Sequence, residues 1–374
     1  MSVAALLFGC AMISATLITP LIRRLAPWLG LVDHPGHRKV HVTPTPMGGG
    51  IAVFLGVVVP SIVFFAMMAT GRLPEEMLPL WEESRPRFAQ LIAVAVGATV
   101  LFFTGLADDR WNLSWKGRLG IQLAVAVGVV LAGVRATVFV SYPWVGAAGT
   151  VLWIIVLTNA MNFLDNMDAL SAGIGVIASL LFAAILLLLV AHPPWLVAGS
   201  LLLLSGSLSG FLVWNRPPAS IFMGDSGSNL IGFLLATLSV VGTFYESGTE
   251  RHVILAPLCV LAVPLYDFCS VILIRLRQGR SPFHGDKSHF SHRLVELGLR
   301  SPHAVMTIHL ATLMTGLGGL LLYKVKDWTG AMLVIALICC VLAVIAILET
   351  VGRRTANDRQ ERRKPTEAGI QDGV

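Results

Sequence analysis

Long apolar segments alternate with short polar loops along most of the chain. Windows of helical length give eleven such segments, at residues 3–22, 48–69, 90–107, 119–137, 146–163, 172–191, 195–213, 229–244, 253–274, 304–323 and 330–349. A helix needs roughly 20 apolar residues to cross the hydrocarbon core of a bilayer, where backbone groups must be bonded internally. Because the alternation typical of barrel strands is absent, the pattern predicts an all-α, polytopic membrane protein with about 11 transmembrane helices.

The composition excludes an ordinary soluble protein. Of the 374 residues, 55% are hydrophobic and 13% are charged, whereas charged residues make up roughly a quarter of a soluble domain. The five cysteines lie in apolar segments without metal-ligand or disulfide spacing, and we interpret them as packing residues. We expect one transmembrane domain over residues 1–351 and a basic, disordered cytoplasmic tail over residues 352–374.

The basic residues predict the orientation of these spans. With eleven spans, twenty of the 27 lysine and arginine residues fall on one side and seven on the other. Cytoplasmic loops carry the excess of positive charge, so we expect the N-terminus outside and the C-terminus in the cytoplasm, with the protein in the inner membrane. The net charge of +6 then reflects topology and contact with anionic lipid, and the dispersed basic residues predict no binding of nucleic acid.

Five polar clusters fall on the predicted cytoplasmic side, and the first joins a basic loop to a run of glycines. Lys39 lies in this loop, and Gly48, Gly49 and Gly50 open the second span. These glycines would let backbone N–H groups approach an anion, to which Lys39 adds a positive charge. A plain positive-inside loop explains the segment equally well.

The second cluster is the pair Asp108-Asp109 at the end of the third span. Two adjacent carboxylates at a membrane edge require a cation or a polar cavity, and they repel each other unless a divalent metal binds or one of them is protonated. The alternative is an interfacial pair that bonds water and Arg110 or Arg118.

The third and fourth clusters combine acids with amides and hydroxyls. Asn159, Asn162 and Asp165 recur every third residue, which places them on one helix face, and Asp168 follows. This face suits a metal or a sugar nucleotide, while helix–helix hydrogen bonding would explain only the amides. Asp225 precedes the eighth span among serines and glycines, an arrangement that suits Mg²⁺ and phosphate, or else a plain helix cap.

The fifth cluster contains His289, His292 and Arg293 in the longest cytoplasmic loop. On a helix their spacing would give one face that donates to phosphate or moves a proton. A zinc site is an alternative that lacks cysteines and a clear third ligand. Asp267, after Pro264 in the ninth span, either faces this site or bonds backbone groups freed by a proline kink, and the sequence leaves both open.

Taken in order, these clusters resemble the polyprenyl-phosphate N-acetylhexosamine-1-phosphate transferase family, glycosyltransferase family 4. The resemblance runs from Asp33 to about Leu294. It includes the basic loop around Lys39, the Asp108-Asp109 pair and Asp225. Arg118 stands ahead of Gln122, where relatives carry a basic residue. Any one motif is weak, but all five in this order are specific.

Two departures from the family pattern refine the resemblance. Residues 159–168 resemble the stretch Asn-x-x-Asn-x-x-Asp-Gly-x-Asp-Gly, with Asn166 and Ala169 in place of its glycines. Phe290 and Ser291 separate the two histidines, whereas phospho-N-acetylmuramoyl-pentapeptide transferases carry consecutive ones. The chain is therefore more similar to the branch that transfers N-acetylglucosamine 1-phosphate to undecaprenyl phosphate.

The resemblance implies transfer of N-acetylhexosamine 1-phosphate from a UDP-sugar to undecaprenyl phosphate, with release of UMP, in cell-envelope glycan synthesis. It implies a Mg²⁺ or Mn²⁺ cofactor, a site on the cytoplasmic face, and leaves open a homodimer. The expected roles are catalysis by Asp108, Asp109, Asp165, His289 and His292; substrate binding by Lys39, Asn159, Asn162, Asp168, Arg118 and Arg293; and metal binding by Asp225, Asp108 and Asp165.

Two other functions fit the sequence less well. A transporter or flippase for a nucleotide sugar or lipid-linked anion places ionisable groups near the bilayer midplane and often shows repeated halves, whereas the acids here cluster at one face. An enzyme that transfers from a CDP-linked donor to an alcohol would carry a dense Asp-Gly and Ala-Arg motif, which the sequence lacks.

Overall fold

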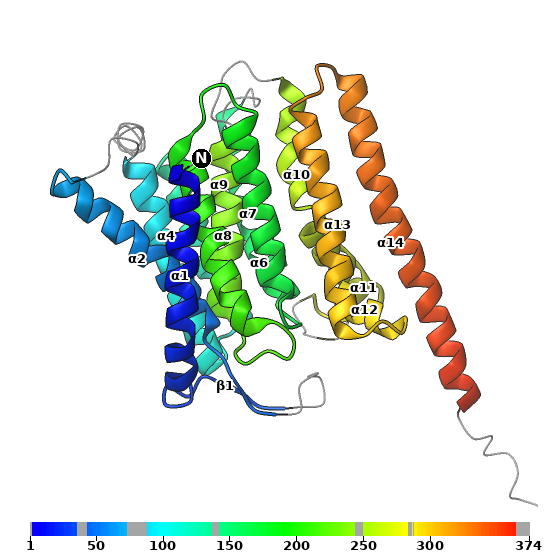
Figure 1. Cartoon of the computed structure of the whole chain (residues 1–374). Coiled ribbons are helices and arrows are strands. Elements are labelled where there is room, and N and C mark those ends of the chain that lie inside the picture. The colour runs from blue at the N-terminus through cyan, green and yellow to red at the C-terminus, as the bar shows by residue number, and fades with distance from the viewer. Residues whose placement is uncertain are drawn as a thin grey trace, which may run out of the picture.

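The structure, a computed structural model, describes residues 2–35, 43–72, 88–136, 142–243, 250–282, 286 and 288–363. Nearly all of this part of the chain is helical (Figure 1). The helices are α1 (Ser2–Leu25), α2 (Gly49–Ala69), α4 (Phe88–Trp111), α5 (Trp115–Leu131), α6 (Pro143–Leu164), α7 (Leu170–Leu188), α8 (Trp195–Asn215), α9 (Asp225–Thr243), the 3₁₀ helix η3 (Arg251–Leu255), α10 (Ala256–Val260), α11 (Ala262–Arg277), α12 (Phe290–Glu296), α13 (Ser301–Leu322) and α14 (Trp328–Arg363).

The protein is a multi-pass membrane protein, and each of the eleven predicted segments contains a helix or a helix pair. Within the described residues, eight helices are long and apolar enough to cross a membrane, and a bent pair gives a ninth. The set does not include α5, which has 17 residues, or α9, which opens on a polar turn. The count of eleven spans therefore stays a prediction.

The ninth predicted segment is broken in the middle. Residues Arg251–Val260 and Ala262–Arg277 form two helical pieces at 68° to each other. Pro264 lies in the first turn of α11 and has no N–H to donate to the carbonyl of Val260, so a continuous helix would lose a bond and clash there. The proline kink, which the sequence left open as one of two alternatives, is therefore present.

The core of the bundle lies around α7 and α8, the most buried of the candidate spans, while α14 is the least buried. In Figure 1, α1 lies beside α8. Small residues of α8 make this approach possible, because a Cβ added to Gly206 or Gly210 would overlap the backbone of Phe8 or Met12 in α1. Close approach of backbones at glycine is a common mode of helix packing in membranes.

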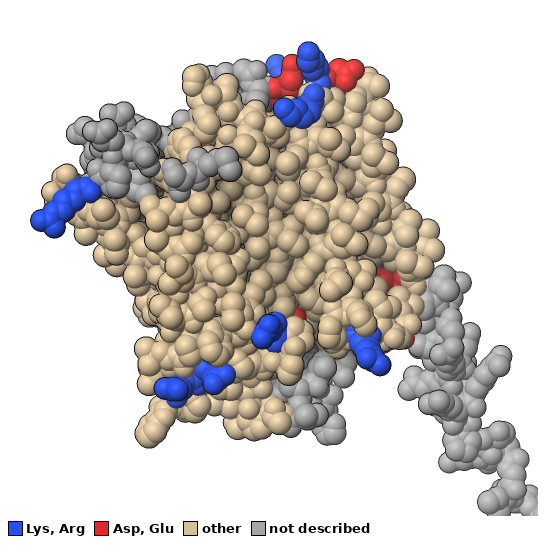
Figure 2. All heavy atoms as spheres, viewed as in Figure 1, with Lys and Arg blue, Asp and Glu red and all other residues tan. Residues whose placement is uncertain are grey.

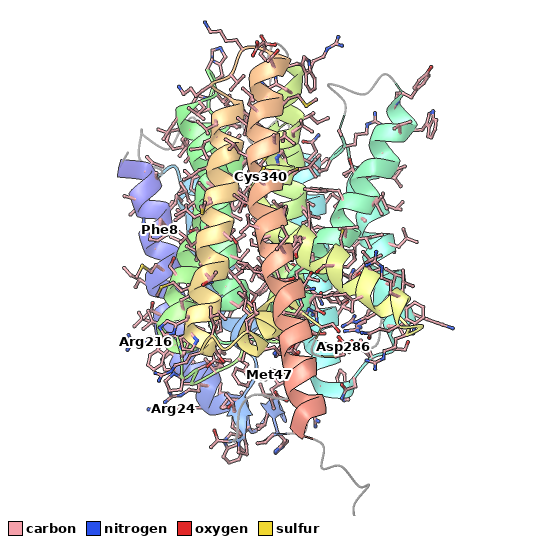
Figure 3. All side chains as sticks on the ribbon, turned by 90° about the vertical axis from the view of Figure 1, so that its right-hand side faces the viewer. Phe8, Arg24, Met47, Arg216, Asp286 and Cys340 are labelled. Atoms are coloured by element: carbon pink, nitrogen blue, oxygen red, sulfur yellow. The ribbon has the colours of Figure 1, made fainter. Side chains whose placement is uncertain are left out.

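The polar clusters lie toward one end of the bundle. A short antiparallel sheet pairs β1 (Val32–Asp33) with β2 (Thr45–Pro46) at the lower end in Figure 1. Figure 3 shows Met47 and Asp286 toward this same end, and Cys340 toward the other. On the face shown in Figure 2, blue and red side chains gather mainly toward the two ends, with a mostly uncharged band between them.

The last helix extends beyond its predicted end. α14 continues to Arg363, so the part of the predicted disordered tail between residues 352 and 363 is helical. In Figure 1, α1 begins at the upper end of the bundle and α14 ends at the lower end. The two helix ends thus lie at opposite ends of the bundle, while the division of the chain at residue 351 and the side that faces the cytoplasm stay predictions.

Candidate active site

Three of the predicted polar clusters meet where three helix ends converge. Asp108 and Asp109 lie in the last turn of α4, Asp165 follows the end of α6, and Asp225 is the first residue of α9. Gly105 makes this possible, because a Cβ at that position would overlap the backbone of Asp225 and Ser226. The structure therefore brings together carboxylates that the sequence separates by long apolar segments.

Asp109 caps α9 from a neighbouring helix. The backbone N–H of Asp225 donates to Oδ1 of Asp109 at 2.7 Å, and the N–H of Ser226 donates to Oδ2 at 3.2 Å. The first N–H groups of a helix have no partner within the helix, and a carboxylate there also interacts favourably with the helix dipole. Gly224, with φ of +78°, turns the chain into this contact.

Arg118 joins the other two carboxylates. Its Nη1 donates to Oδ2 of Asp225 at 2.8 Å and also contacts Oδ2 of Asp108. Asp108 is buried, and its Oδ1 accepts the N–H of Leu113 at 2.6 Å. The side chains of Arg118 and Asp225 are each 30% exposed, so this part of the cluster is open to a ligand.

The amide and acid face of α6 contacts three neighbouring helices. Nδ2 of Asn159 donates to Oε1 of Gln122 at 2.7 Å, and Nδ2 of Asn162 donates to Oγ of Ser228 at 3.1 Å. Oδ1 of Asp165 accepts from Oγ of Ser171 at 2.6 Å. These bonds to α5, α9 and α7 hold the end of α6 in place, as the helix–helix alternative predicts for the amides.

Burial raises the pKa of Asp165 to about 7. The hydrogen bond from Ser171 opposes this change, and the charge of nearby Asp109 adds to it. An acid with this pKa sits between its two protonation states near neutral pH, so a cation that binds close by would favour the ionised form.

Asp168 and Ala169 shape the turn between α6 and α7. Oδ2 of Asp168 accepts the N–H of Ala219 at 2.9 Å, and the N–H of Ala169 donates to Oδ1 of Asn215 at 2.9 Å. Ala169 has φ of +64°, in the left-handed region that favours glycine. The turn thus has a backbone conformation that glycine adopts readily, although the residue here is alanine.

The segment that contains His289 and His292, called the histidine segment below, lies against the end of α6. The ring of His289 meets Phe163 edge to face at 5.5 Å between centroids, and Oγ of Ser291 donates to Oδ1 of Asn166 at 2.6 Å. His289 precedes α12 rather than lying within it, so the prediction of one helical face for His289 and His292 is wrong in detail. The local cause is an extended backbone at His289, and the two rings still lie 6.4 Å apart.

Arg293 is buried among protein groups. Its side chain is 3% exposed, and Nη2 donates to Oγ of Ser270 at 2.8 Å. Nε lies 3.2 Å from Oε2 of Glu349. The structure therefore shows Arg293 bonded within the protein, and its predicted contact with substrate stays a prediction.

Some predicted site residues differ or lie outside the described part of the chain. Lys39 and its loop, residues 36–42, are outside it.

The N–H groups of Gly49 and Gly50 donate to the carbonyls of Phe222 and Met223 at 2.8 and 2.9 Å, so they fix the loop before α9. The interpretation of these N–H groups as an anion site is therefore wrong, because that loop satisfies them.

Three residues near the site were missed by the sequence interpretation. Arg275 is almost fully buried, and its Nη1 and Nη2 donate to the carbonyl of Pro282 at 2.6 Å and to Oδ1 of Asp286 at 3.1 Å. Burial opposes ionisation of Asp286, but bonds from Arg275 and Ser288 hold its pKa below the usual value. Glu349 was also missed, although a lone acid in an apolar span is a recognised signal of a buried partner.

The donor chemistry of the acid cluster fits Mg²⁺. Mg²⁺ prefers oxygen ligands and is usually held by one or two carboxylates together with water and substrate phosphates. Asp108 and Asp225 supply such a pair, and a guanidinium now lies between their oxygens. In the described residues, no group of three or more His, Cys, Asp or Glu is arranged to hold a metal by itself.

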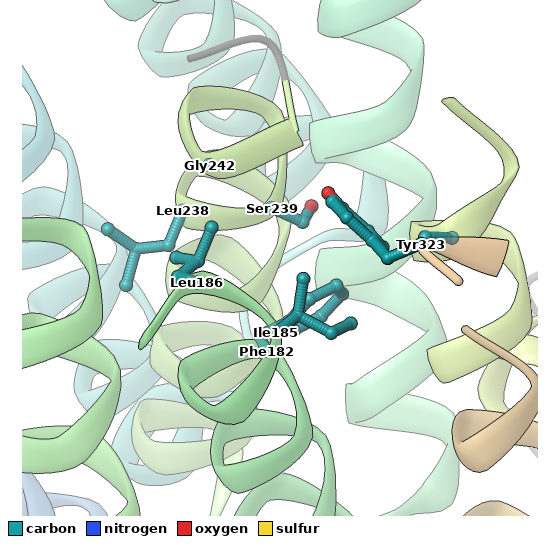
Figure 4. Close-up of a pocket in the computed structure, with 8 residues that line it drawn as sticks. Phe182, Ile185, Leu186, Leu238, Ser239, Gly242 and Tyr323 are labelled. Atoms are coloured by element: carbon teal, nitrogen blue, oxygen red, sulfur yellow. The ribbon is translucent and has the colours of Figure 1, made fainter. Parts of the chain in front are cut away.

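A small pocket among the described residues lies away from the acid cluster. It lies near the end of α9 opposite to Asp225, and its lining is mostly apolar, with Phe182, Leu186, Leu238 and Tyr323 around Ser239 (Figure 4). Apolar walls do not offer ligands for Mg²⁺ or a diphosphate. The acid cluster, and not this pocket, is the candidate active site.

Comparison with known proteins agrees with this geometry. The model of the family described as glycosyl transferase family 4 matches residues 91–243, which contain the four clustered aspartates. The chain is 31% identical to a probable undecaprenyl-phosphate N-acetylglucosaminyl 1-phosphate transferase of Bacillus subtilis, over 93% of this chain and 92% of that protein.

Two further relatives have the same type of name. A decaprenyl-phosphate N-acetylglucosaminephosphotransferase of Mycobacterium tuberculosis is 34% identical, over 87% of this chain and 85% of its own length. An undecaprenyl-phosphate alpha-N-acetylglucosaminyl 1-phosphate transferase of Salmonella typhimurium is 29% identical, over 93% of this chain and 94% of its own length. The acids of this chain are gathered at one end of a helical membrane bundle. These similarities in sequence show that the chain belongs to glycosyl transferase family 4.

Proposed function

We propose that the chain transfers N-acetylglucosamine 1-phosphate from a UDP-sugar to undecaprenyl phosphate or a related polyprenyl phosphate, and releases UMP. The observation that carries the proposal is the convergence of Asp108, Asp109, Asp165 and Asp225 at one end of the bundle, where Arg118 bridges Asp108 and Asp225. The names of the three relatives support both the sugar phosphate and the lipid acceptor.

The position of the site suits a lipid acceptor. The polyprenyl chain would stay among apolar helices while its phosphate reaches the polar end of the bundle. The excess of basic residues on the side of this cluster supports a cytoplasmic location in the inner membrane, where nucleotide sugars are found.

The reaction brings two anions together. An oxygen of the lipid phosphate attacks the sugar-bearing phosphorus of the donor, the bond from that phosphorus to UMP breaks, and UMP leaves with the bond electrons. The second pKa of a phosphate monoester is about 6, so the acceptor is largely a dianion at neutral pH. Direct attack therefore needs little help from a base, and we favour it over a covalent intermediate on Asp108.

The metal site of the proposal lies between α4 and α9. Asp225 and Asp108 would hold Mg²⁺, with Asp165 close by, and the ion would offset the charge of the donor diphosphate. Asp109 does a different task, since it fixes the first turn of α9 through two backbone N–H groups. Arg118 would bind phosphate oxygens once the metal replaces it between the two carboxylates.

The remaining polar residues orient the reactants. Asn162 holds Ser228 in the first turn of α9, and Asn159 holds Gln122 next to Arg118 on α5. His289 lies beside Phe163 at the end of α6, where a ring nitrogen can bond a phosphate oxygen or move a proton. These roles rest on position and on the chemistry of each side chain.

The test is UMP release by purified protein in detergent, with undecaprenyl phosphate, Mg²⁺ and a panel of UDP-sugars. We expect release with UDP-N-acetylglucosamine that requires both the lipid phosphate and Mg²⁺ and is lost in Asp225→Asn. The charge-matched control is Asp327→Asn, because Asp327 caps α14 at the other end of the bundle. Folded protein that releases UMP with no donor in the panel would overturn the proposal.

A further inference from the structure

A second buried polar cluster lies beside the acid cluster and is not used in the proposed chemistry. It consists of Asp267 on α11, Arg293 on α12 and Glu349 on α14, whose exposed fractions are 0%, 3% and 5%. Tyr266 and Ser270 complete it. Burying three ionisable side chains is costly unless each is paired, so a function for the arrangement has to explain why all three are retained.

Asp267 binds the histidine segment with both oxygens. Oδ1 accepts the backbone N–H of Phe290 at 2.6 Å, and Oδ2 lies 3.0 Å from Nδ1 of His289. An ionised carboxylate can only accept hydrogen bonds, so Nδ1 of His289 must carry its hydrogen. This contact fixes both the ring orientation and the tautomer, and leaves Nε2 as the nitrogen for the substrate side.

Arg293 links Asp267 to the last helix. Its Nη2 lies 3.9 Å from Oδ1 of Asp267 and donates to Ser270 at 2.8 Å, while Nε lies 3.2 Å from Oε2 of Glu349. The hydroxyl of Tyr266 donates to the same Oε2 at 3.0 Å, and the guanidinium lies over the Tyr266 ring. Residues from α11, α12 and α14 thus form one continuous set of contacts.

We propose that Asp267 and Glu349 are positioning residues: Asp267 fixes the ring and tautomer of His289, and Glu349 holds α12 in register through Arg293. The part that concerns catalysis rests on the proposed function, because it assumes that His289 faces the substrate. The structural part, the tautomer of His289, does not depend on the reaction.

The surroundings of His289 favour a positioning role for Asp267. One ring edge meets Phe163 of α6, the helix that carries Asn162 and ends at Asp165, and Ser291 bonds Asn166 on the same turn. The ring is therefore placed relative to the acid cluster by α6, while its rotation is set by Asp267 on α11. A preorganised group aimed at the charge that develops in the transition state contributes about 100-fold or more to kcat, and this contribution depends on its orientation.

The Asp267→Asn substitution gives a specific expectation for the tautomer. Phe290 N–H and His289 Nδ1–H both donate to Asp267, but an asparagine offers one oxygen and one NH₂ group. Because a backbone N–H cannot change its hydrogen, the asparagine oxygen faces Phe290 and the NH₂ faces His289. We expect the histidine to move its hydrogen from Nδ1 to Nε2.

The experiment is NMR of ¹⁵N-histidine-labelled protein in detergent, with the His289 signals assigned by their loss in His289→Gln. The expected result is a hydrogen on Nδ1 of His289 in the unmodified chain and a shift of the neutral ring to the Nε2–H form in Asp267→Asn. A neutral ring in the Nε2–H form in the unmodified chain overturns the proposal, and this measurement stands even if Asp267→Asn does not fold.

Kinetic measurements then distinguish a positioning role of Asp267 and Glu349 from an effect of their substitution on folding alone. We expect kcat to fall about 100-fold in Asp267→Asn, with KM for the donor changed less than about 3-fold, as for loss of an oriented group that acts on the charge of the reacting phosphates in the transition state. Glu349→Gln keeps the acceptor for Tyr266 but loses the charge beside Arg293, and should lower kcat about 10-fold without changing the tautomer.

Two matched variants complete the test. Leu348→Ala changes an exposed neighbour of Glu349 on α14 and should keep full activity, and Glu349→Asp should recover part of the loss seen in Glu349→Gln. Unchanged kcat in folded Asp267→Asn and Glu349→Gln overturns the positioning role. If the unmodified protein releases no UMP, the proposed function fails, while the NMR result still decides the tautomer.

Discussion

Nη1 of Arg118 lies 2.8 Å from Oδ2 of Asp225. The same nitrogen contacts Asp108, so one guanidinium joins the start of α5 to the end of α4 and the start of α9. A positive group stands between the two carboxylates that suit Mg²⁺ best. Metal and arginine therefore compete for the same oxygens, and this competition leads to a measurable effect.

Replacing Arg118 should strengthen metal binding and weaken catalysis. In Arg118→Gln we expect the Mg²⁺ concentration for half-maximal UMP release to fall about 3- to 10-fold, because a positive charge near the metal is removed. We also expect kcat to fall, because a donor to the phosphate oxygens is lost. Lys116→Gln is the control, since Lys116 carries the same charge on α5 but lies over Trp115. A higher Mg²⁺ requirement in Arg118→Gln would contradict the competition.

The pKa of Asp165 predicts how metal-free protein responds to pH. The pKa of this carboxyl rises from 3.8 to about 7 on folding. Between these pH values the folded state keeps a proton that the unfolded state has released. The stabilisation of the folded state by this proton is complete below pH 3.8 and is lost as the pH rises through about 7. In EDTA, the apparent Tm should fall between pH 5.5 and 8, and Asp165→Asn should lack this part of the fall. Equal pH dependence in both proteins would count against the raised pKa.

Gly224 should tolerate no side chain. Its φ is +78°, and an added Cβ would lie 2.6 Å from Oδ2 of Asp109. Gly224→Ala should therefore displace Asp109 from the first turn of α9, with about 1–2 kcal/mol of backbone strain as a minimum cost. We expect a lower apparent Tm and strongly reduced UMP release.

The control for this substitution is Gly120→Ala. Gly120 lies within α5, and an added Cβ there has no atom within 4 Å. Alanine favours a helix over glycine by about 1 kcal/mol, so the apparent Tm should stay equal or rise. Similar losses in both variants would mean that the position of Gly224 has no special role.

Arg275 should not be replaceable by lysine. It donates from Nη1 to Pro282 and from Nη2 to Asp286, and a single ammonium cannot match this geometry from the same place. Breaking a buried ion pair costs about 3–5 kcal/mol. We expect Arg275→Lys to lower the apparent Tm by several degrees and Arg277→Lys, at an exposed position of the same helix, to leave it unchanged. An unchanged Tm in Arg275→Lys would show that a single hydrogen bond from this position is enough for full stability.

Helix positions followed from the sequence because each apolar segment needs a helix in lipid. The acid cluster also followed, since Asp108, Asp165 and Asp225 all lie at helix ends, where chain direction and charge limit their positions. The partners of these acids did not follow. That Asp109 caps α9 depends on the approach of two helices at Gly105, which involves residues far apart in the chain.

The environment of His289 shows the same limit. Two alternatives for Asp267 were equal on the sequence alone, and its contacts with His289 and Phe290 now favour the one in which it faces the site. That choice depends on the bend before Pro264, which sets the direction of α11. An acid in an apolar span such as Glu349 signals that a partner exists, but only packing of α14 against α12 identifies Arg293.

The pairing of Glu349 with Arg293 also bears on how the protein is made. Asp267, Arg293 and Glu349 leave the ribosome in that order, and α14 follows the other described helices along the chain. Until then Arg293 lacks one of its two carboxylate neighbours. The histidine segment therefore receives the support of Glu349 only after α14 has been synthesised, and a chain that stops before Glu349 would lack it.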